Sequence, residues 1–557
     1  MRRLLWQKWL RLCDRVRARR RSCRLSGRLT RCQPRVELLE DRLAPATLHW
    51  VGDTSPSGDK WSVASNWSEN AVPSATDSDL IFDTSFATIN NFNANNDVPG
   101  LTANLTITIF SDDPINNFIL TGNSINLAAG GIVSSGSSGS DALISFSSIV
   151  LGEDSTIANN SSTFTLLISS PINTNSQTLV LDGTGTSQLS GVISGTGAVT
   201  KTGTGTAVLT NLLNSYTGLT TIQQGRLLVD GVAGDVLLDG GLLGGQGTVG
   251  TITASSNGGI VAPGASTAIL TTTGPVTWNN SVTFSVELNG TTPGMQHDQL
   301  QVNGTIDLGG ATLSVNLGYN ATIGDAFQII LSTGGVSGTF NGLPDLAQFT
   351  VGNRIFEIDY DYAANMVVLT VVGYVSTTTV SSSVNPSVFG QNVTFTATVT
   401  GPAGSGTPTG TVDFIIDGTT VASGVALDGF GQATYSTSTL TVTGSPHSVQ
   451  VNYNGDSNFN PSVGTLTLGQ TVQPANTTTA VSSSINPSVF GQSVTFTATV
   501  TAVAPGSGTP TGTVDFIIDG TTVASGVALD GFGQATYSTS TLTVTGSPHS
   551  VQVNYNG

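Results

Sequence analysis

The chain has 557 residues, of which 67 are glycine and only 10% are charged, and its formal net charge is −17. This length exceeds that of one compact domain, and a composition rich in Gly, Thr, Ser and Asn excludes a largely helical protein and favours strands and turns. Residues 1–45 carry a net charge of about +10 and residues 46–557 about −27, which excludes the acidic body, with its four basic side chains, as a nucleic-acid-binding surface.

Cysteine usage and hydropathy set two further limits. Cys13, Cys23 and Cys32 all lie in the basic leader, at spacings that match no zinc site. The body has no cysteine, so strand pairing and apolar stacking must stabilise it instead of disulfides. No apolar run is long enough to cross a bilayer as a helix, so no membrane-spanning helix is expected.

Residues 1–45 form the first predicted segment, an Arg-rich leader without the apolar core of an ordinary secretory signal. Its end, "RVELLEDRLAPA", resembles the N-terminal sorting signature of large bacterial surface proteins, which implies export to the cell exterior. Two alternatives remain open here, a disordered basic tail and a nucleic-acid-binding arm. The resemblance rests on Glu37, Leu39, Glu40, Arg42, Pro45 and Ala46.

Residues 46–375 contain many short β-patterned runs separated by Gly, Asn and Ser, with no helical period. Such short strands cannot bury an apolar face alone, so each must stack on the next, as in a parallel β-helix. The stretch 199–231 shows one unit of this pattern. Its predicted inward-facing residues are Val208, Leu219, Ile222, Leu227 and Val229.

This stretch is similar to the autotransporter-associated β-strand repeat of bacterial passenger domains, whose pattern begins K-x-G-x-G. The resemblance implies a β-helical stalk in an extracellular setting. The matching residues are Lys201, Gly203, Gly205, Leu209, Asn214, Tyr216, Gly218, Thr220, Ile222, Gly225 and Leu227.

A β-helix can also be an enzyme that cleaves polysaccharides. A lyase needs a basic residue and a cationic group beside an enolate, which four scattered basic residues make improbable. A hydrolase needs only two or three carboxylates on one rung. In "FEIDYDY", alternation places Glu357, Asp359 and Asp361 on one strand face, as a catalytic site, a calcium site or a solvated surface would require.

Two further groups in this region have competing interpretations. His297, beside Asp298, is expected to be a solvated loop residue, because no second histidine lies near it to share a metal. The tryptophans that open the body could stack on a sugar ring, but aromatic residues at the start of a solenoid more often cap its end. These tryptophans are Trp50, Trp61 and Trp67.

Residues 376–475 and 476–557 are two copies of one module, because the run 406–455 recurs unchanged at 508–557. Alternation in "VTFTATV" and "TVDFII" predicts strands whose inward residues include Val393, Phe395, Ala397, Val399, Val412, Phe414 and Ile416. Hairpin turns are expected at Asp417-Gly418 and at Asp428-Gly429, and a late strand should point Val449, Val451 and Tyr453 inward. Several such strands in about 100 residues predict an Ig-like antiparallel sandwich.

The amino-acid sequence of these modules resembles the bacterial Ig-like domain 3 family over most of each copy. This family supplies spacers and adhesive modules in surface proteins, and the resemblance carries over no catalytic residue. Asp456, beside Asn458, is a candidate calcium ligand, with a polar turn as the alternative, and His447 and His549 are expected to be turn residues. The second copy ends without a counterpart of residues 456–472, so we expect a fragment of a longer array with an exposed strand edge.

The sequence thus predicts an all-β protein, a parallel β-helix followed by Ig-like sandwich repeats. We expect a non-enzymatic extracellular or cell-surface protein with a structural or adhesive role. The alternatives are a polysaccharide-binding or polysaccharide-degrading β-helix and a calcium-dependent matrix protein. No catalytic residue and no cofactor is predicted, calcium being the one candidate ion, and the candidate partners are cell-surface glycans or other extracellular proteins.

Overall fold

The computed structural model describes residues 47–52, 59–74, 79–83, 93–103, 106–110, 118–127, 130–137, 141–361 and 363–557. The leader 1–45 and the signature resemblance at 37–46 lie outside these ranges. Thr47–Gly557 is one compact unit. Over the described ranges the fold is all-β, as predicted, and its one helical segment is the 3-10 turn η2 (Ala64–Asn66). No helix there is long and apolar enough to span a membrane.

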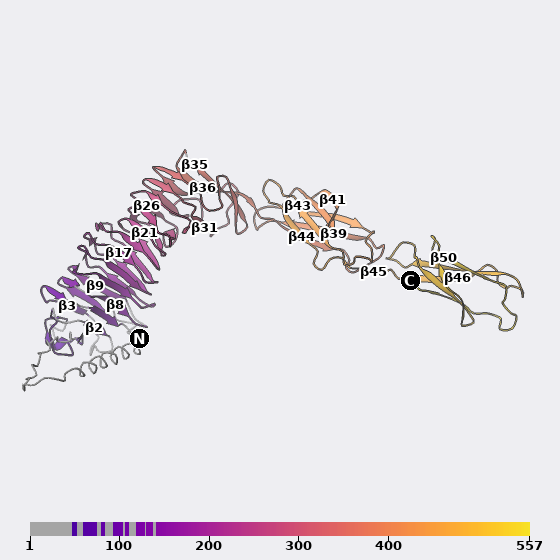
Figure 1. Cartoon of the computed structure of the whole chain (residues 1–557), viewed down its shortest axis with the longest axis horizontal. Helices are drawn as coiled ribbons and strands as arrows, with labels where there is room; N and C mark the ends of the chain where they lie inside the picture. The colour runs from indigo at the N-terminus through magenta and orange to yellow at the C-terminus, as the bar shows by residue number, and fades with distance from the viewer. Residues whose placement is uncertain are drawn as a thin grey trace, which may run out of the picture. The chain divides into compact units, whose positions relative to one another are not determined.

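Two long parallel sheets run through residues 47–337, and Figure 1 shows their strands stacked one behind another. From β2 to β31, each coil of the chain adds one strand to each sheet, which is the arrangement of a parallel β-helix. The first sheet contains β1 (Thr47–His49), β2 (Asp79–Asp83), β5 (Thr106–Phe110), β8 (Gly131–Ser135), β11 (Ser155–Asn159), β14 (Leu179–Gly183), β17 (Val199–Lys201), β19 (Thr220–Ile222), β21 (Val236–Leu238), β24 (Ile252–Ala254), β27 (Val276–Thr277), β30 (Thr305–Asp307) and β33 (Gly335–Ser337). The second contains β3 (Asn93–Asn96), β6 (Ile119–Gly122), β9 (Ala142–Phe146), β12 (Thr165–Ile168), β15 (Thr186–Leu189), β18 (Thr206–Leu209), β20 (Arg226–Val229), β22 (Leu242–Gly245), β25 (Gly259–Pro263), β28 (Val282–Leu288) and β31 (Thr312–Leu317).

Two shorter sheets complete the solenoid. A five-stranded parallel sheet is formed by β4 (Leu101–Ala103), β7 (Ile125–Leu127), β10 (Ile149–Leu151), β13 (Ile172–Asn173) and β16 (Ile193–Ser194). A seven-stranded sheet begins parallel and ends in antiparallel pairs, where the solenoid pattern stops. Its strands are β23 (Thr248–Val249), β26 (Ile269–Thr272), β29 (Gln299–Val302), β32 (Ala326–Ser332), β36 (Met366–Tyr374), β35 (Arg354–Asp361) and β34 (Gln348–Val351).

The core of the solenoid consists of rows of side chains in register from coil to coil. One row runs through β14, β17 and β19, where Leu181 pairs with Lys201 and Lys201 with Ile222. Since each short strand buries only alternate residues, stacking supplies the apolar contacts that a single coil lacks. The predicted inward positions Ile222, Leu227 and Val229 are confirmed, because all three side chains are fully buried.

Two predicted inward positions are wrong. Val208 points outward because its neighbours Ala207 and Leu209 on β18 are the buried residues, and a shift of one residue reverses the face. Leu219 precedes β19, whose inward residues are Thr220 and Ile222, and is 42% exposed. In both places the prediction relied on apolar character alone and assigned the side chain to the wrong face of the strand.

The N-terminal end of the solenoid is closed by an aromatic cluster. Trp50, Trp61 and Trp67 are at most 1% exposed and pack around Phe82, and the Trp50 and Trp67 ring centroids lie 5.2 Å apart, edge to face. The indole of Trp67 donates a hydrogen bond to the main-chain oxygen of Trp61, at 3.0 Å. The capping interpretation is therefore confirmed. Sugar stacking on these rings is wrong, because no ring face is open to solvent.

The first Ig-like module pairs a three-stranded sheet with a four-stranded sheet, all antiparallel, plus a small parallel pair. The predicted alternation is confirmed: the named Val, Phe, Ala and Ile residues of 393–416 and the set Val449, Val451 and Tyr453 are buried. The strands are β37 (Thr377–Ser382), β39 (Val393–Thr400) and β42 (Gln432–Thr437); β41 (Thr419–Ala426), β40 (Thr411–Ile416), β43 (Val449–Tyr453) and β44 (Ser462–Thr465); β38 (Ser387–Val388) and β45 (Val472–Gln473).

The turns of this module differ in kind. Asp417 and Gly418 both have positive φ, 48° and 76°, as a two-residue hairpin turn between β40 and β41 requires. The turn at Asp428-Gly429 exists, but the prediction of a hairpin is wrong, because β41 and β42 belong to different sheets.

The second module has two three-stranded antiparallel sheets, so the sheet that corresponds to β41, β40, β43 and β44 has one strand fewer. Its strands are β46 (Thr477–Ser483), β47 (Val494–Ala502) and β50 (Gln534–Thr539), then β49 (Thr521–Ala528), β48 (Thr513–Ile518) and β51 (Val551–Tyr555).

Candidate functional site

The residues of the 199–229 repeat unit act as scaffold. Lys201 is 1% exposed and its ammonium group donates hydrogen bonds to the main-chain oxygens of Gly203 and Gln224. Burial lowers the pKa of Lys201 to about 8, although the nearby Asp182 carboxylate opposes this effect. The one basic side chain in this interior row is thus engaged by the backbone around it and does not face solvent.

Asn214 and Tyr216 of the same unit connect neighbouring coils. The Asn214 side-chain oxygen accepts a hydrogen bond from the amide of Ile193 at 2.8 Å, and its nitrogen donates to the oxygen of Val232 at 2.9 Å. Tyr216 is buried and its hydroxyl lies 2.7 Å from that of Thr220. Asn214 therefore satisfies backbone groups of the coils on both sides. The loop between β18 and β19 forms no strand there that could pair with these groups.

Glycines of the unit are required by the close stacking of coils. A Cβ atom at Gly203 would lie 2.2 Å from the main-chain oxygen of Gly183 in the preceding coil, and one at Gly225 would lie 2.4 Å from that of Gly203. Gly225 also has a φ of 65°. The second glycine of the K-x-G-x-G run, Gly205, is required in the same way, because a Cβ atom there would lie 2.1 Å from the main-chain oxygen of Gly185.

The candidate carboxylates of β35 lie on one face, as alternation requires, because Phe356, Ile358 and Tyr360 are the buried residues between and before them. Glu357 accepts a hydrogen bond from Gln348 at 3.2 Å, and Asp361 accepts bonds from the amides of Ala363 and Ala364. These three carboxylates with Asp345 form what we call the acidic face.

The acidic face perturbs one of its own members. Burial and then repulsion by Asp345, Asp361 and Glu357 raise the pKa of Asp359 above its ordinary value. In the described part of the chain no three or more His, Cys, Asp or Glu side chains are grouped so that they could hold a metal ion. Calcium binding at the acidic face therefore stays a prediction.

Asp456 organises a polar turn. One carboxylate oxygen accepts the amides of Asn458 and Phe459 at 2.7 and 2.8 Å, and the other accepts the amide and hydroxyl of Thr409 at 2.8 and 2.7 Å. Burial alone would raise the pKa of Asp456, but these bonds outweigh it and lower the pKa. With four donors already on its oxygens, the side chain would have to give up hydrogen bonds to bind calcium, which also stays a prediction.

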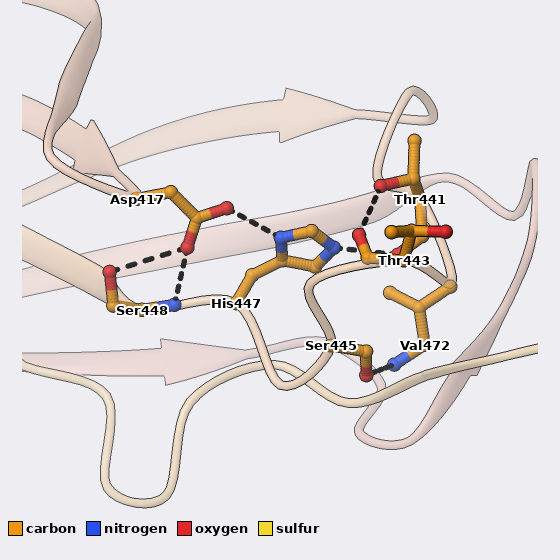
Figure 2. Close-up of polar contacts among 7 residues, drawn as sticks. All are labelled: Asp417, Thr441, Thr443, Ser445, His447, Ser448 and Val472. Carbon is orange, nitrogen blue, oxygen red and sulfur yellow. Dashed lines mark hydrogen bonds and ion pairs between the residues drawn. The ribbon is translucent and has the colours of Figure 1, made fainter.

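His447 lies at the centre of the polar cluster drawn in Figure 2. Its ring is buried, with Nδ1 2.6 Å from Asp417 and Nε2 2.7 Å from the main-chain oxygen of Thr441. The other oxygen of Asp417 accepts the amide of Ser448 at 2.9 Å. The expectation of a simple turn residue missed this burial, and no pattern around "SPHSVQV" indicates which side chains surround the ring.

The Asp417–His447 pair resembles two members of a serine-hydrolase triad but cannot act as one in this geometry. A triad base needs an unprotonated Nε2 directed at a hydroxyl nucleophile. Here Nε2 faces the oxygen of Thr441, a group that only accepts hydrogen bonds, so this bond exists only when Nε2 donates. While both ring nitrogens donate, the ring has no free lone pair with which to remove a proton.

His297 and Asp298 are buried, so the expectation of a solvated loop is wrong. His297 packs edge to face on Phe327, with ring centroids 5.5 Å apart, and burial lowers its pKa. Asp298 is 2% exposed and accepts the amides of Ala268 and Glu287 at 3.0 and 2.8 Å. Burial outweighs these bonds and raises the pKa of Asp298 to about 7. The 289–297 segment is held to the preceding coil, since the Thr267 hydroxyl donates to the main-chain oxygen of Met295 at 3.0 Å, and local sequence did not reveal this contact.

Comparison with known proteins matches both the solenoid and the Ig-like modules to known families. Residues 378–473 and 479–557 match the family described as bacterial Ig-like domain (group 3). Residues 199–229 match the passenger-associated-transport-repeat. The chain combines a passenger-type repeat with two bacterial Ig-like domains.

Two relatives have similar segments. The chain is 42% identical over 81 residues to an adhesin, the BmaC autotransporter of Brucella suis biovar 1 (strain 1330), covering 14% of this chain and 2% of the relative. It is 34% identical over 161 residues to an extracellular serine protease of Serratia marcescens, covering 27% of this chain and 15% of the relative. The chain thus spans less than a sixth of either relative.

The passenger-type repeat and these relatives define the compartment. The chain is an extracellular or cell-surface protein. This agrees with the predicted location, which the resemblance of the 199–231 stretch had implied. The activities named for the relatives belong to proteins that extend far beyond the matched segments.

Proposed function

We propose that residues 46–557 form a non-enzymatic scaffold at the cell surface, a β-helical stalk with Ig-like spacer modules and an adhesive role. The observation that carries the proposal is that the side chains with reactive groups are engaged in hydrogen bonds that stabilise the fold. Lys201 is buried against carbonyl oxygens, Asp456 accepts from four donors, and both ring nitrogens of His447 face acceptor oxygens of the same domain. The exposed surface carries many Thr, Ser and Asn side chains beside its carboxylates, and these side chains are suited to hydrogen bonding with glycans or extracellular proteins.

The experiment is a paired binding and hydrolysis assay on the purified chain. We expect retention on immobilised glycans or extracellular matrix proteins, and no release of peptides from casein above a heat-denatured sample. Casein cleavage that survives removal of contaminating proteases and is lost in His447→Gln would overturn the non-enzymatic part of the proposal. Failure to bind any of the immobilised ligands would overturn the adhesive part and leave the spacer role.

A second candidate function, polysaccharide degradation, is favoured by one observation. Asp359 has a raised pKa beside other carboxylates, as does the acid of a glycosidase carboxylate pair. The measurement is release of reducing ends from acidic and neutral polysaccharides by the chain and by Asp359→Asn. Glu153→Gln is the matched control, because it removes one exposed negative charge elsewhere on the solenoid. Activity lost only in Asp359→Asn would support this candidate, and no activity in either protein would reject it.

A further inference from the structure

The buried imidazole of His447 sits between two groups that only accept hydrogen bonds. Nδ1 faces the Asp417 carboxylate and Nε2 faces the Thr441 main-chain oxygen, as Figure 2 shows. A neutral imidazole carries one N–H, so it can satisfy only one of these two acceptors. Both bonds can exist together only when the ring is protonated.

The two bonds join separate parts of the first Ig-like domain. Asp417 lies at the tip of the β40–β41 hairpin, and Thr441 lies in the 438–446 loop between β42 and β43. The segment 466–471 also packs here, since the amide of His447 donates to the oxygen of Gln470 at 2.9 Å. Across the hairpin turn, the loop and this segment, Asp417 and His447 are the only titratable or charged side chains.

We propose that His447 is a proton-dependent clamp that fastens the 438–446 loop to the β40–β41 hairpin when the ring is protonated and releases it when the ring is neutral. This device goes beyond the scaffold function, because it makes a surface loop of the spacer module responsive to external pH. Loss of the proton breaks the bond to Thr441 or the bond to Asp417, but the loop keeps a separate anchor. The Ser445 hydroxyl accepts the amide of Val472 at 2.8 Å. Release is therefore local and leaves the domain folded.

The same arrangement recurs in the second Ig-like domain. His549 Nδ1 lies 2.5 Å from Asp519, and Nε2 lies 2.8 Å from the main-chain oxygen of Thr543 in the 540–548 loop. Asp519 also has a positive φ, 52°, at the tip of the β48–β49 hairpin. The chain thus contains two copies of the device, and each can serve as the control for the other.

The direction of the pH effect follows from both partners. Burial alone would lower the pKa of His447, but its bonds to Asp417 and Thr441 outweigh burial and raise the pKa. Burial alone would raise the pKa of Asp417, but its bonds to His447 and Ser448 lower it. The clamp is closed below the raised histidine pKa and opens as the pH rises through it. At the acidic end it opens as the pH falls through the lowered pKa of Asp417.

The test is hydrogen–deuterium exchange of the whole chain between pH 5 and pH 9, corrected for the intrinsic exchange rate. In the unaltered protein we expect protection of both loops to fall above the histidine pKa, by up to about tenfold per pH unit, the slope for one linked proton. In His447→Gln the 438–446 loop should be weakly protected at every pH, while the 540–548 loop keeps its pH dependence. Protection that is independent of pH in the unaltered, folded protein would overturn the proposal.

A second variant keeps the proposal testable if His447→Gln does not fold. Asp417→Asn leaves a residue that tolerates positive φ and still offers an acceptor, but it removes the negative charge beside the ring. The midpoint of loop release should then move to lower pH in the first domain and stay unchanged in the second. An unchanged midpoint in the first domain would show that the ring does not govern the loop.

Discussion

Lys201 directs its ammonium group at the main-chain oxygen of Gly203 from within an aliphatic row of the solenoid, between Leu181 and Ile222. This relationship explains why the repeat has a lysine followed by a glycine two residues later. The buried ammonium group needs a nearby carbonyl oxygen, and the glycine allows the backbone that carries this oxygen to come close. It also creates a buried basic group whose protonation depends on folding.

The buried lysine should make stability depend on alkaline pH. Its pKa falls from 10.5 to about 8 on folding, so the unfolded chain binds more protons between these values and stability rises as the pH rises from 8 to 10.5. The gain should be on the order of 2 kcal/mol. In Lys201→Met this part of the pH dependence should vanish from urea unfolding curves, whereas Lys60→Met, an exposed position, should leave it in place. Identical slopes in Lys201→Met and the unaltered chain would contradict the prediction.

Gly203→Ala should destabilise the solenoid through a steric clash. The new Cβ would lie 2.2 Å from the oxygen of Gly183, a backbone atom that cannot move alone. We expect a loss of about 2 kcal/mol or more, seen as a lower solenoid melting temperature in calorimetry. Gly429→Ala is the control, because no atom lies within 4 Å of a Cβ there. Equal melting temperatures of the two variants would show that the coils can separate without cost.

Sequence predicted the strand content and the modules, because period-two alternation and stacking of short strands are local signals. It predicted the face of Ile222, Leu227 and Val229 but misjudged Val208 and Leu219. These two residues lie beside turns, where the phase is set by contacts between coils. The hairpin expected at Asp428 failed for a related reason, since sheet membership depends on distant strands.

The acidic face should bind calcium weakly, with a dissociation constant in the millimolar range that few-ligand extracellular sites show. Carboxylates two residues apart on a strand are about 7 Å from one another, too far to share one ion closely. Millimolar calcium is expected to raise the solenoid melting temperature slightly, and Asp359→Asn to remove the increase. Submicromolar binding by calorimetric titration would contradict this spacing argument. If the melting temperature does not shift at 10 mM calcium, roughly ten times the weakest dissociation constant of such sites, the acidic face does not bind calcium.

The candidate site residues were harder to predict than the fold. Glu357, Asp359 and Asp361 could be placed on one face from their spacing alone. The roles of Asp456, His447 and Asp298 each depend on at least one partner 11 to 47 residues away, for example Thr409 for Asp456 and Asp417 for His447. A single sequence carries no local signal for such pairs, and the burial of His297 and Asp298 has the same origin.

Asp298 should make the solenoid less stable as the pH rises from about 4 to 7. Burial raises its pKa from 3.8 to about 7, so the folded chain binds more protons than the unfolded chain in this interval, and stability falls with rising pH. The fall should reach about 3 kcal/mol. Asp298→Asn should lose stability at pH 4, because the amide can accept only one of the two backbone bonds, but its stability should change little from pH 4 to 7. The measurement is urea unfolding at pH 4, 5.5 and 7, with Asp307→Asn as an exposed control. A variant that keeps the full pH dependence would assign it to another group.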